Sequence, residues 1–263
     1  MTLFIISCLL TGALAGFLAG LFGIGGGLVI VPVLVHLLPT IGVPDSLVMN
    51  VALGSSFATI VITAFSSAQR HHNLGNVDWQ ASKYLIPALM VSVFIAGLFI
   101  SHLPKSITSK LFAIMVLYLA LKMLLSIKHQ TGSKALTAKS GIIGGAIIGM
   151  ISSFAGIAGG AFIVPFLNAR GIEMKRAIGT SSFCGMLLGL SGMISFIISG
   201  LHVENLPQYS LGYVYLPAVV LITLVSFFTS KFGATLTTKL PVSTLKKAFA
   251  LWLCLVALKM LIG

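Results

Sequence analysis

Long apolar runs separated by short polar stretches make up most of the chain. The runs that carry few or no charges cover residues 3–38, 47–69, 84–103, 111–127, 141–169, 177–201, 206–230 and 248–262. Most of them approach or exceed the length of about 20 residues that a helix needs to cross a bilayer. The pattern therefore predicts an all-α fold, a polytopic membrane helical bundle with roughly six to ten crossings.

The composition supports the same class of protein. Hydrophobic residues make up 57% of the 263 residues and charged residues only 8%, with a mean hydropathy of +1.11. A soluble domain carries about 25% charged residues, so this supply cannot cover a water-exposed surface. A soluble enzyme, a disordered protein and a secreted disulfide scaffold are thereby excluded.

The net charge of +12 has two interpretations. Lys and Arg in cytoplasmic loops set the orientation of membrane proteins and contact anionic lipid. A positive potential would also attract an anionic substrate. No basic helix face with interleaved aromatic residues lies outside the apolar runs, so we expect membrane lipid and a small anion as partners, and no nucleic acid.

The two halves of the chain are repeats. Residues 12–34 align with residues 145–167 at eleven identical positions of 23, and residues 103–124 align with residues 240–261. Between these matches, residues 55–57 (SSF) align with residues 181–183 (SSF). We predict a first repeat over residues 1–127, a cytoplasmic linker over 128–140 and a second repeat over 141–263, each repeat with four apolar segments.

The first apolar segment of each repeat is expected to be broken. Residues 3–38 would form a single helix roughly 54 Å long, far more than a bilayer requires. Glycine clusters interrupt both segments, and a proline follows each cluster. These residues are Gly23, Gly25, Gly26 and Gly27 with Pro32, and Gly156, Gly159 and Gly160 with Pro165. Because glycine and proline interrupt helices, we predict a helix, a glycine turn and a shorter helix.

The loop charges favour opposite orientations of the two repeats. The loop at 39–46 lacks Lys and Arg, whereas its counterpart at 168–176 is basic. The next loops reverse this bias, because 70–83 is basic and 202–212 is not. The positive-inside rule then predicts inverted repeats with both termini outside. Four plain crossings per repeat, with parallel repeats, remain the alternative.

The candidate substrate site lies at the two breaks. A glycine turn that opens a helix offers free N–H groups and a partial positive charge, which suits a small oxyanion. Hydroxyl residues in the next segment can bind the same anion or bond back to their own helix. The predicted substrate-binding residues are Gly25, Gly26, Gly27, Ser55, Ser56, Gly159, Gly160, Thr180, Ser181 and Ser182. Glycines that only allow close helix packing are the alternative explanation.

Other chemistry has little support in the sequence. Cys8, Cys184 and Cys254 lie in apolar runs without metal-ligand spacing, so we expect neither a metal site nor a cofactor. No Asp or Glu lies deep in an apolar run, and no nucleophile and base occur together, so we do not expect an enzyme. We interpret residues 70–78 as a capped cytoplasmic loop in front of Trp79, without a clear counterpart in the second half.

These glycine and serine motifs resemble the TauE/SafE family of sulfite-exporter-like transporters. The resemblance covers nearly the whole chain and rests on GLFGIGGGLVIVP at 20–32, GIAGGAFIVP at 156–165, AIGTSSF at 177–183 and GNVDW at 75–79. It implies a multi-pass permease of the bacterial inner membrane that exports sulfite, sulfoacetate, thiosulfate or related organosulfonates. An anion channel and an uptake permease for another small organic anion are the alternatives, and the oligomeric state stays open, a homodimer included.

Overall fold

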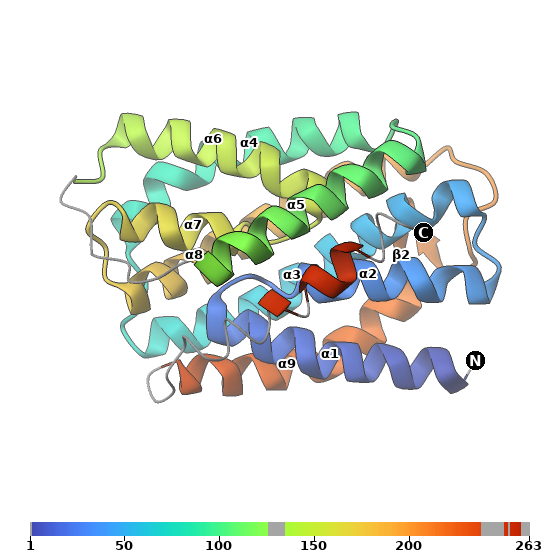
Figure 1. The fold of residues 1–263 in the computed structure, drawn as a ribbon, viewed down its shortest axis with the longest axis horizontal. Coiled ribbons are helices and arrows are strands. Elements are labelled where there is room, and N and C mark those ends of the chain that lie inside the picture. The colour runs from blue at the N-terminus through green and yellow to red at the C-terminus, as the bar shows by residue number, and fades with distance from the viewer. Residues whose placement is uncertain (1, 126–134, 238–249, 252, 259–263) are drawn as a thin grey trace.

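The structure, a computed structural model, describes residues 2–125, 135–237, 250–251 and 253–258, and it is built almost entirely from helices (Figure 1). The elements are α1 (Thr2–Phe22), α2 (Gly27–Leu37), the short helix η1 (Leu38–Ile41), α3 (Asp45–Asn73), α4 (Trp79–Ile100), α5 (Lys105–Leu125), α6 (Ala138–Ala155), α7 (Gly160–Asn168), α8 (Met174–Gly200), β1 (Ser210–Leu211), β2 (Val214–Tyr215) and α9 (Leu216–Leu236).

Six helices among the described residues are long and apolar enough to cross a membrane, namely α1, α3, α4, α6, α8 and α9. The prediction of an all-α polytopic bundle is therefore confirmed. Much of the predicted linker at 128–140 lies outside the described residues, as does part of the last apolar run at 248–262. Within that linker, α6 begins at Ala138 behind a capping box of Thr137 and Ser140.

Both predicted helix breaks are present. Non-helical residues separate α1 from α2 and α6 from α7, and Gly26 and Gly159 cap the shorter helices with φ angles of 82° and 71°. Residues with a side chain rarely adopt such positive φ angles, so glycine is required at both positions. A Cβ added to Gly26 would lie 3.0 Å from the Cβ of Ala15, so α2 starts back along α1.

The first helix of each half packs against the helix of the third apolar segment of the other half. The pairs are α1 with α9 and α6 with α4, and glycines let the backbones touch, as their fourfold spacing predicts. Added Cβ atoms would overlap backbone atoms at these positions: Gly12 at Ile222, Gly16 at Ser226, Gly20 at Ser230, Gly145 at Leu85 and Gly149 at Leu89. At Gly141 the added Cβ would overlap the Cβ of Tyr84. Residue numbers rise together within each pair, so both pairs run parallel.

Helices α3 and α8 lie at the centre and run antiparallel. Near one end, the hydroxyls of Ser67 and Ser182 are 3.0 Å apart. Toward the other end, the rings of Phe57 and Phe196 lie 5.7 Å apart. Because one number falls as the other rises, the second segments of the two halves point in opposite directions.

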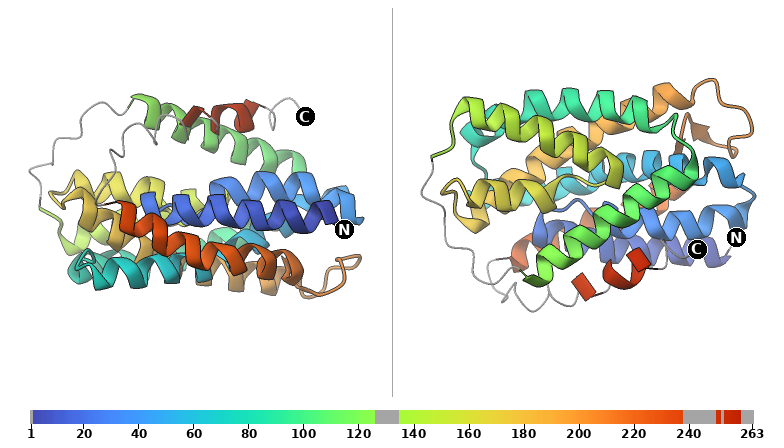
Figure 2. Two further views of the ribbon diagram at one scale, coloured as in Figure 1. Left: turned by 90° about the horizontal axis from the view of Figure 1, so that it is seen from below. Right: turned by 45° about the horizontal axis from the view of Figure 1, so that its top comes forward.

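The last segments of the two halves form a separate layer. Helix α5 and the helical residues 250–251 and 253–258 lie side by side along one face of the bundle (Figure 2). The described residues 250–251 and 253–258 belong to the stretch 240–261 that matches 103–124 in sequence, and they lie beside the helix formed by its counterpart.

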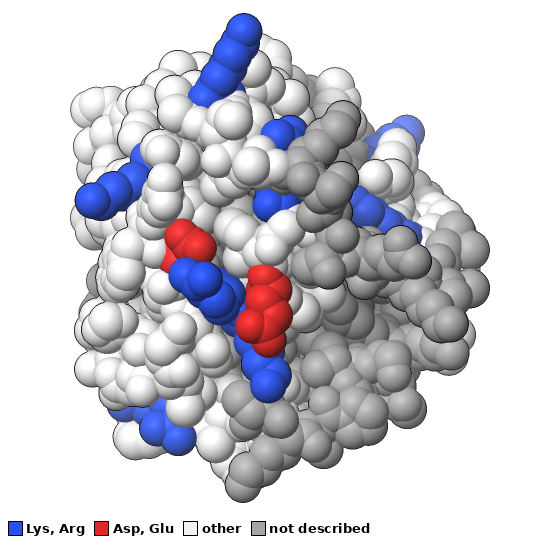
Figure 3. Space-filling model, turned by 90° about the vertical axis from the view of Figure 1, so that its left-hand side faces the viewer, with Lys and Arg blue, Asp and Glu red and all other residues white. Residues whose placement is uncertain are grey.

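Positive charge gathers at one end of the bundle, which we call the basic end (Figure 3). It is formed where α3, α7 and α9 end and where α4, α6 and α8 begin. It carries Arg70, Lys83, Lys139, Arg170, Lys175, Arg176 and Lys231, with Asp78 and Glu173 among them. At the opposite end, Lys105 and Lys110 are offset by Asp45 and Glu204, and Lys105 pairs with Asp45.

One expectation about the loops was wrong. The run that begins at Arg70 was assigned to a cytoplasmic loop, but α3 continues to Asn73. His71 is consequently a buried helical residue, and its Nε2 donates to the carbonyl oxygen of Gly20 at 3.1 Å. Local polarity indicated a loop here, whereas contact with α1 keeps the last turn helical.

The packing of α1 on α9 yields a stability prediction. The substitution Gly16→Leu should lower the free energy of unfolding by about 3 kcal/mol, because its Cβ would overlap the backbone of Ser226. Thermal unfolding in detergent measures the effect, and Leu14→Met, on an exposed face of α1, is the control. An unchanged unfolding midpoint in Gly16→Leu would contradict the close helix contact.

Candidate functional site

The two helix breaks lie directly against each other. A Cβ added to Gly27 would overlap the carbonyl oxygen of Gly156, and a Cβ added to Gly160 would overlap that of Gly23. These two contacts are equivalent, because Gly23 aligns with Gly156 and Gly27 with Gly160. The glycine motifs are thus matched surfaces, and neither break could approach the other with side chains at these positions.

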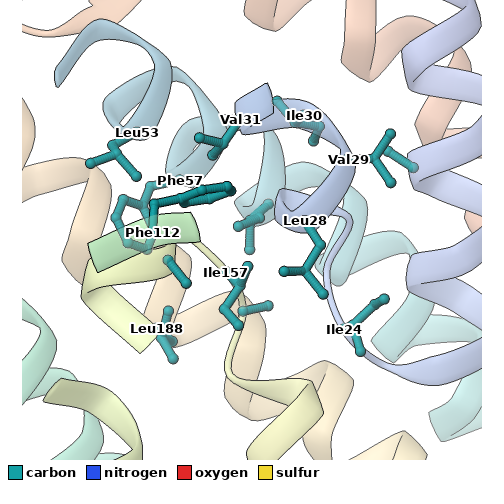
Figure 4. Packing of buried hydrophobic residues seen from close by; sticks show 14 of the residues in the cluster. Ile24, Leu28, Val29, Ile30, Val31, Leu53, Phe57, Phe112, Ile157 and Leu188 are labelled. Atoms are coloured by element: carbon teal, nitrogen blue, oxygen red, sulfur yellow. The ribbon is translucent and has the colours of Figure 1, made fainter. Parts of the chain in front are cut away.

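The hydrophobic core encloses this contact. Ile24 and Ile157 belong to the breaks, and both point into one cluster with Leu28 and Leu188 (Figure 4). All four side chains are buried. Breaking a helix inside an apolar cluster leaves backbone groups without water, so each group must find a partner in the protein.

Serine hydroxyls from the central helices bind the exposed carbonyls. The Oγ of Ser56 on α3 donates to the carbonyl oxygen of Gly156 at 2.9 Å, and the Oγ of Ser181 on α8 donates to that of Gly23 at 3.1 Å. Each hydroxyl thus satisfies a carbonyl in the break of the other half. Two of the predicted serines therefore contact the breaks, at Gly156 and Gly23, which lie outside the predicted set of binding glycines.

The neighbouring hydroxyls hold the starts of two other helices. The backbone N–H of Asp78 donates to Thr180 Oγ1 at 2.8 Å, and the N–H of Tyr215 donates to Ser55 Oγ at 2.9 Å. Asp78 and Tyr215 are the N-cap residues of α4 and α9. Asp78 also accepts from the N–H of Ala81 at 2.9 Å, which confirms its expected capping role.

These contacts correct two details of the repeat alignment. The first is the register, because the contacts pair Ser55 with Thr180 and Ser56 with Ser181, one residue away from the match of the identical SSF letters. The second concerns residues 70–78, which were expected to have no clear counterpart in the second half, although their end at 76–78 has one in the structure. Gly54 lies against the carbonyl of Tyr213 and Gly179 against that of Asn76, so residues 213–215 are its structural equivalent.

The short helices open with free amide groups. The first hydrogen bonds of α2 run from Val29 and Ile30 to the carbonyl of Gly26, and those of α7 run from Phe162 and Ile163 to that of Gly159. Amides before these donors lack an intrahelical acceptor, as at any helix start. Each short helix therefore directs N–H groups and a partial positive charge into the buried region.

All ten predicted site residues are buried in this conformation. Ser182 differs from the rest, because its Oγ donates to the carbonyl of Ile178 at 3.2 Å and lies beside Ser67. The five glycines lie at the breaks, and Ser56 and Ser181 are hydrogen-bonded to them. Ser55 and Thr180 are bonded instead to the starts of α9 and α4. In the described part of the chain, no three His, Cys, Asp or Glu side chains lie close enough together to hold a metal ion.

Two buried polar side chains near the breaks were missed by the sequence analysis. Ser152 Oγ and His71 Nδ1 are buried, and neither has a hydrogen-bond partner among the described residues. The repeat alignment contained a signal for Ser152, because Ala19 occupies its position in the first half. The burial of His71 was not predicted, because its neighbours in the sequence are charged or polar.

The sequence is similar to a family of membrane transporters. The family model described as Sulfite exporter TauE/SafE matches residues 8–260. A probable membrane transporter protein of Haemophilus influenzae is 66% identical over 258 residues, which is 98% of each chain. A probable membrane transporter protein of Methanocaldococcus jannaschii is 30% identical over 235 residues, 88% of this chain and 86% of the relative. No solved structure matches the chain.

The serine contacts give a second stability prediction. Ser56→Ala and Ser181→Ala should each lower the free energy of unfolding by about 1–3 kcal/mol, because each leaves a buried carbonyl unpaired. Denaturant titration of the purified protein measures this cost. Ser195→Ala is the matched control, since Ser195 Oγ bonds within its own helix to Gly192. Equal stability of all three variants would show that the carbonyls have other partners.

Proposed function

Because the chain belongs to the sulfite exporter TauE/SafE family, we propose that it is a secondary carrier that exports small sulfur-containing anions. The anions are sulfite, sulfoacetate, thiosulfate or related organosulfonates. The family and the names of the relatives indicate a membrane transporter, and the six apolar helices make it a multi-pass protein, as expected for the bacterial inner membrane. The substrate and the direction are the parts that this proposal adds.

The observation that carries the proposal is the meeting of two helix starts inside the protein. Helices α2 and α7 begin at Gly27 and Gly160, within the buried contact of the two breaks. A helix start binds oxyanions through its amides and its dipole, and broken helices supply such sites in transporters. The proposed cradle consists of Gly25, Gly26 and Gly27 with Gly159 and Gly160. A metal cation fits poorly, because no carboxylate lies beside these residues.

The hydroxyl residues are proposed to serve the same anion. Ser56 and Ser181 each lie one hydrogen bond from a break, so their hydroxyls can rotate from the carbonyl to a bound oxyanion. Ser55 and Thr180 hold helix starts that flank the same place. Ser182 is the member with the weakest support, since its hydroxyl lies beside Ser67.

Burial favours a carrier over a channel. All residues of the cradle are closed off from solvent in this conformation, so an anion reaches them only after helices move. A carrier that alternates between two open states passes through such a closed state. A channel remains the second candidate, because the positive charge at the basic end would favour anions in either mechanism.

We further propose that the two repeats are inverted in the membrane. The antiparallel packing of α3 on α8 supports this arrangement, as do the parallel pairs of α1 with α9 and α6 with α4. The excess of Lys and Arg at the basic end supports a cytoplasmic location for that end. Exported anions would then enter from the side where the positive potential is highest.

Transport assays with reconstituted liposomes test the function. The protein should move sulfite or sulfoacetate with saturation, and substrate on the far side should accelerate the flux. Gly26→Leu and Gly159→Leu should abolish it, because a side chain at these positive φ angles displaces the helix starts. Val220→Leu, on an exposed face of α9, is the control.

Two results would contradict this account. Normal flux in both glycine variants would show that the proposed cradle does not bind the transported anion. Flux without saturation and without acceleration by substrate on the far side would replace the carrier by a channel.

Topology reporters test the inversion. Reporters fused after Pro39 and after Arg170 follow the return helices of the two halves, so they should lie on opposite sides of the membrane. The second reporter should lie in the cytoplasm, since it adjoins the basic end. Reporters found on the same side would leave only parallel repeats.

A further inference from the structure

The two helix starts differ in what surrounds them. A Cβ added to Gly26 would meet the Cβ and the carbonyl oxygen of Ala15, each at 3.0 Å. Around Gly159, the corresponding atoms are all from side chains: Leu188 Cδ1 at 3.0 Å, Ser152 Oγ at 3.1 Å and Ile163 Cδ1 at 3.2 Å. Backbone therefore closes the first helix start, whereas rotatable side-chain ends close the second.

Within the described part of the chain the hydroxyl of Ser152 has no hydrogen-bond partner, although the side chain is fully buried. A serine in a helix ordinarily donates to a carbonyl one turn earlier. The adjacent Ser153 does so, with its Oγ 3.1 Å from the carbonyl of Gly149 and 3.3 Å from that of Val93. Ser152 Oγ instead faces Gly159, the residue that caps α7. A buried donor left unpaired is costly, so its place in the fold calls for an explanation, and a ligand that accepts its hydrogen bond is one.

The donors next to Ser152 complete a candidate binding site. Helix α7 has nine residues, and the amides of Gly160 and Ala161 precede its first intrahelical donor, Phe162. These amides and the Ser152 hydroxyl all approach the same capping glycine. Two amides and one hydroxyl match the several oxygens of a sulfonate group or of the sulfite dianion, which accept hydrogen bonds and have no proton to donate.

We propose that Ser152 and the start of α7 form the anion subsite, and that the first break is its structural support. This proposal rests on the proposed function, and it assigns the substrate to one half of the repeat. At this subsite a bound anion takes the place of the methyl ends of Leu188 and Ile163, whereas at Gly26 it would meet the backbone of Ala15. The counterpart position in the first half is Ala19, which supplies no hydroxyl.

Calorimetric titration of the purified protein in detergent with sodium sulfite and with sulfoacetate tests the subsite. Ser152→Ala should raise the Kd about tenfold, because one hydrogen bond to a charged ligand is lost. Ser152→Thr, which keeps the hydroxyl, should stay within a few-fold of the original Kd. Ser153→Ala is the matched control and should leave the Kd unchanged, since its hydroxyl already has partners.

The outcomes separate this proposal from the function on which it rests. If the unaltered protein binds and transports these anions and Ser152→Ala does so with the same Kd, the subsite is refuted and the carrier stands. An unaltered protein that binds neither sulfite nor sulfoacetate refutes the proposed function, and the subsite with it. If Ser153→Ala also raises the Kd tenfold, the effect comes from a general disturbance of α6, and the assignment is overturned.

Discussion

A helix interrupted inside an apolar core must find new partners for the backbone groups that the interruption exposes. This constraint explains the arrangement of the described residues better than any single contact. The carbonyls of Gly23 and Gly156 accept hydrogen bonds from Ser181 and Ser56, so each break is completed by a central helix of the other half. The amides that open α2 and α7 lack an intrahelical acceptor, and the proposed anion subsite uses those of α7.

The same constraint accounts for the interlocked halves. Glycines at the breaks allow the two turns to touch, and the glycine stripes of α1 and α6 bring α9 and α4 close on either side. Ser55 and Thr180 then tie the starts of α9 and α4 to the central pair of helices. Neither half can satisfy its own break, which means that both are needed to form the buried region.

The sequence predicted those features that depend on local residue type. The glycine clusters predicted the helix breaks, the lengths of the apolar runs predicted the membrane-spanning helices, and the polar residues before Trp79 predicted the capped start of α4. Each of these features depends on residues that are close together in the sequence. The hydrogen-bond partners of the hydroxyls could not be predicted from the sequence, since Ser56 and Gly156 are 100 residues apart. The identical SSF triplets also gave an alignment of the two central helices that differs by one residue from their structural equivalence. His71 and Ser152 were overlooked for the same reason, because only tertiary packing decides whether a polar side chain is buried and unpaired.

The location of a bound anion tests the central claim most directly. Selenite is the selenium counterpart of sulfite, and its position in crystals follows from anomalous scattering at the selenium absorption edge. The account predicts one anomalous peak between the two breaks, within hydrogen-bond distance of the amides that open a short helix. A reproducible peak only at the basic end, or density at the breaks that excludes any ligand in saturating selenite, would contradict it.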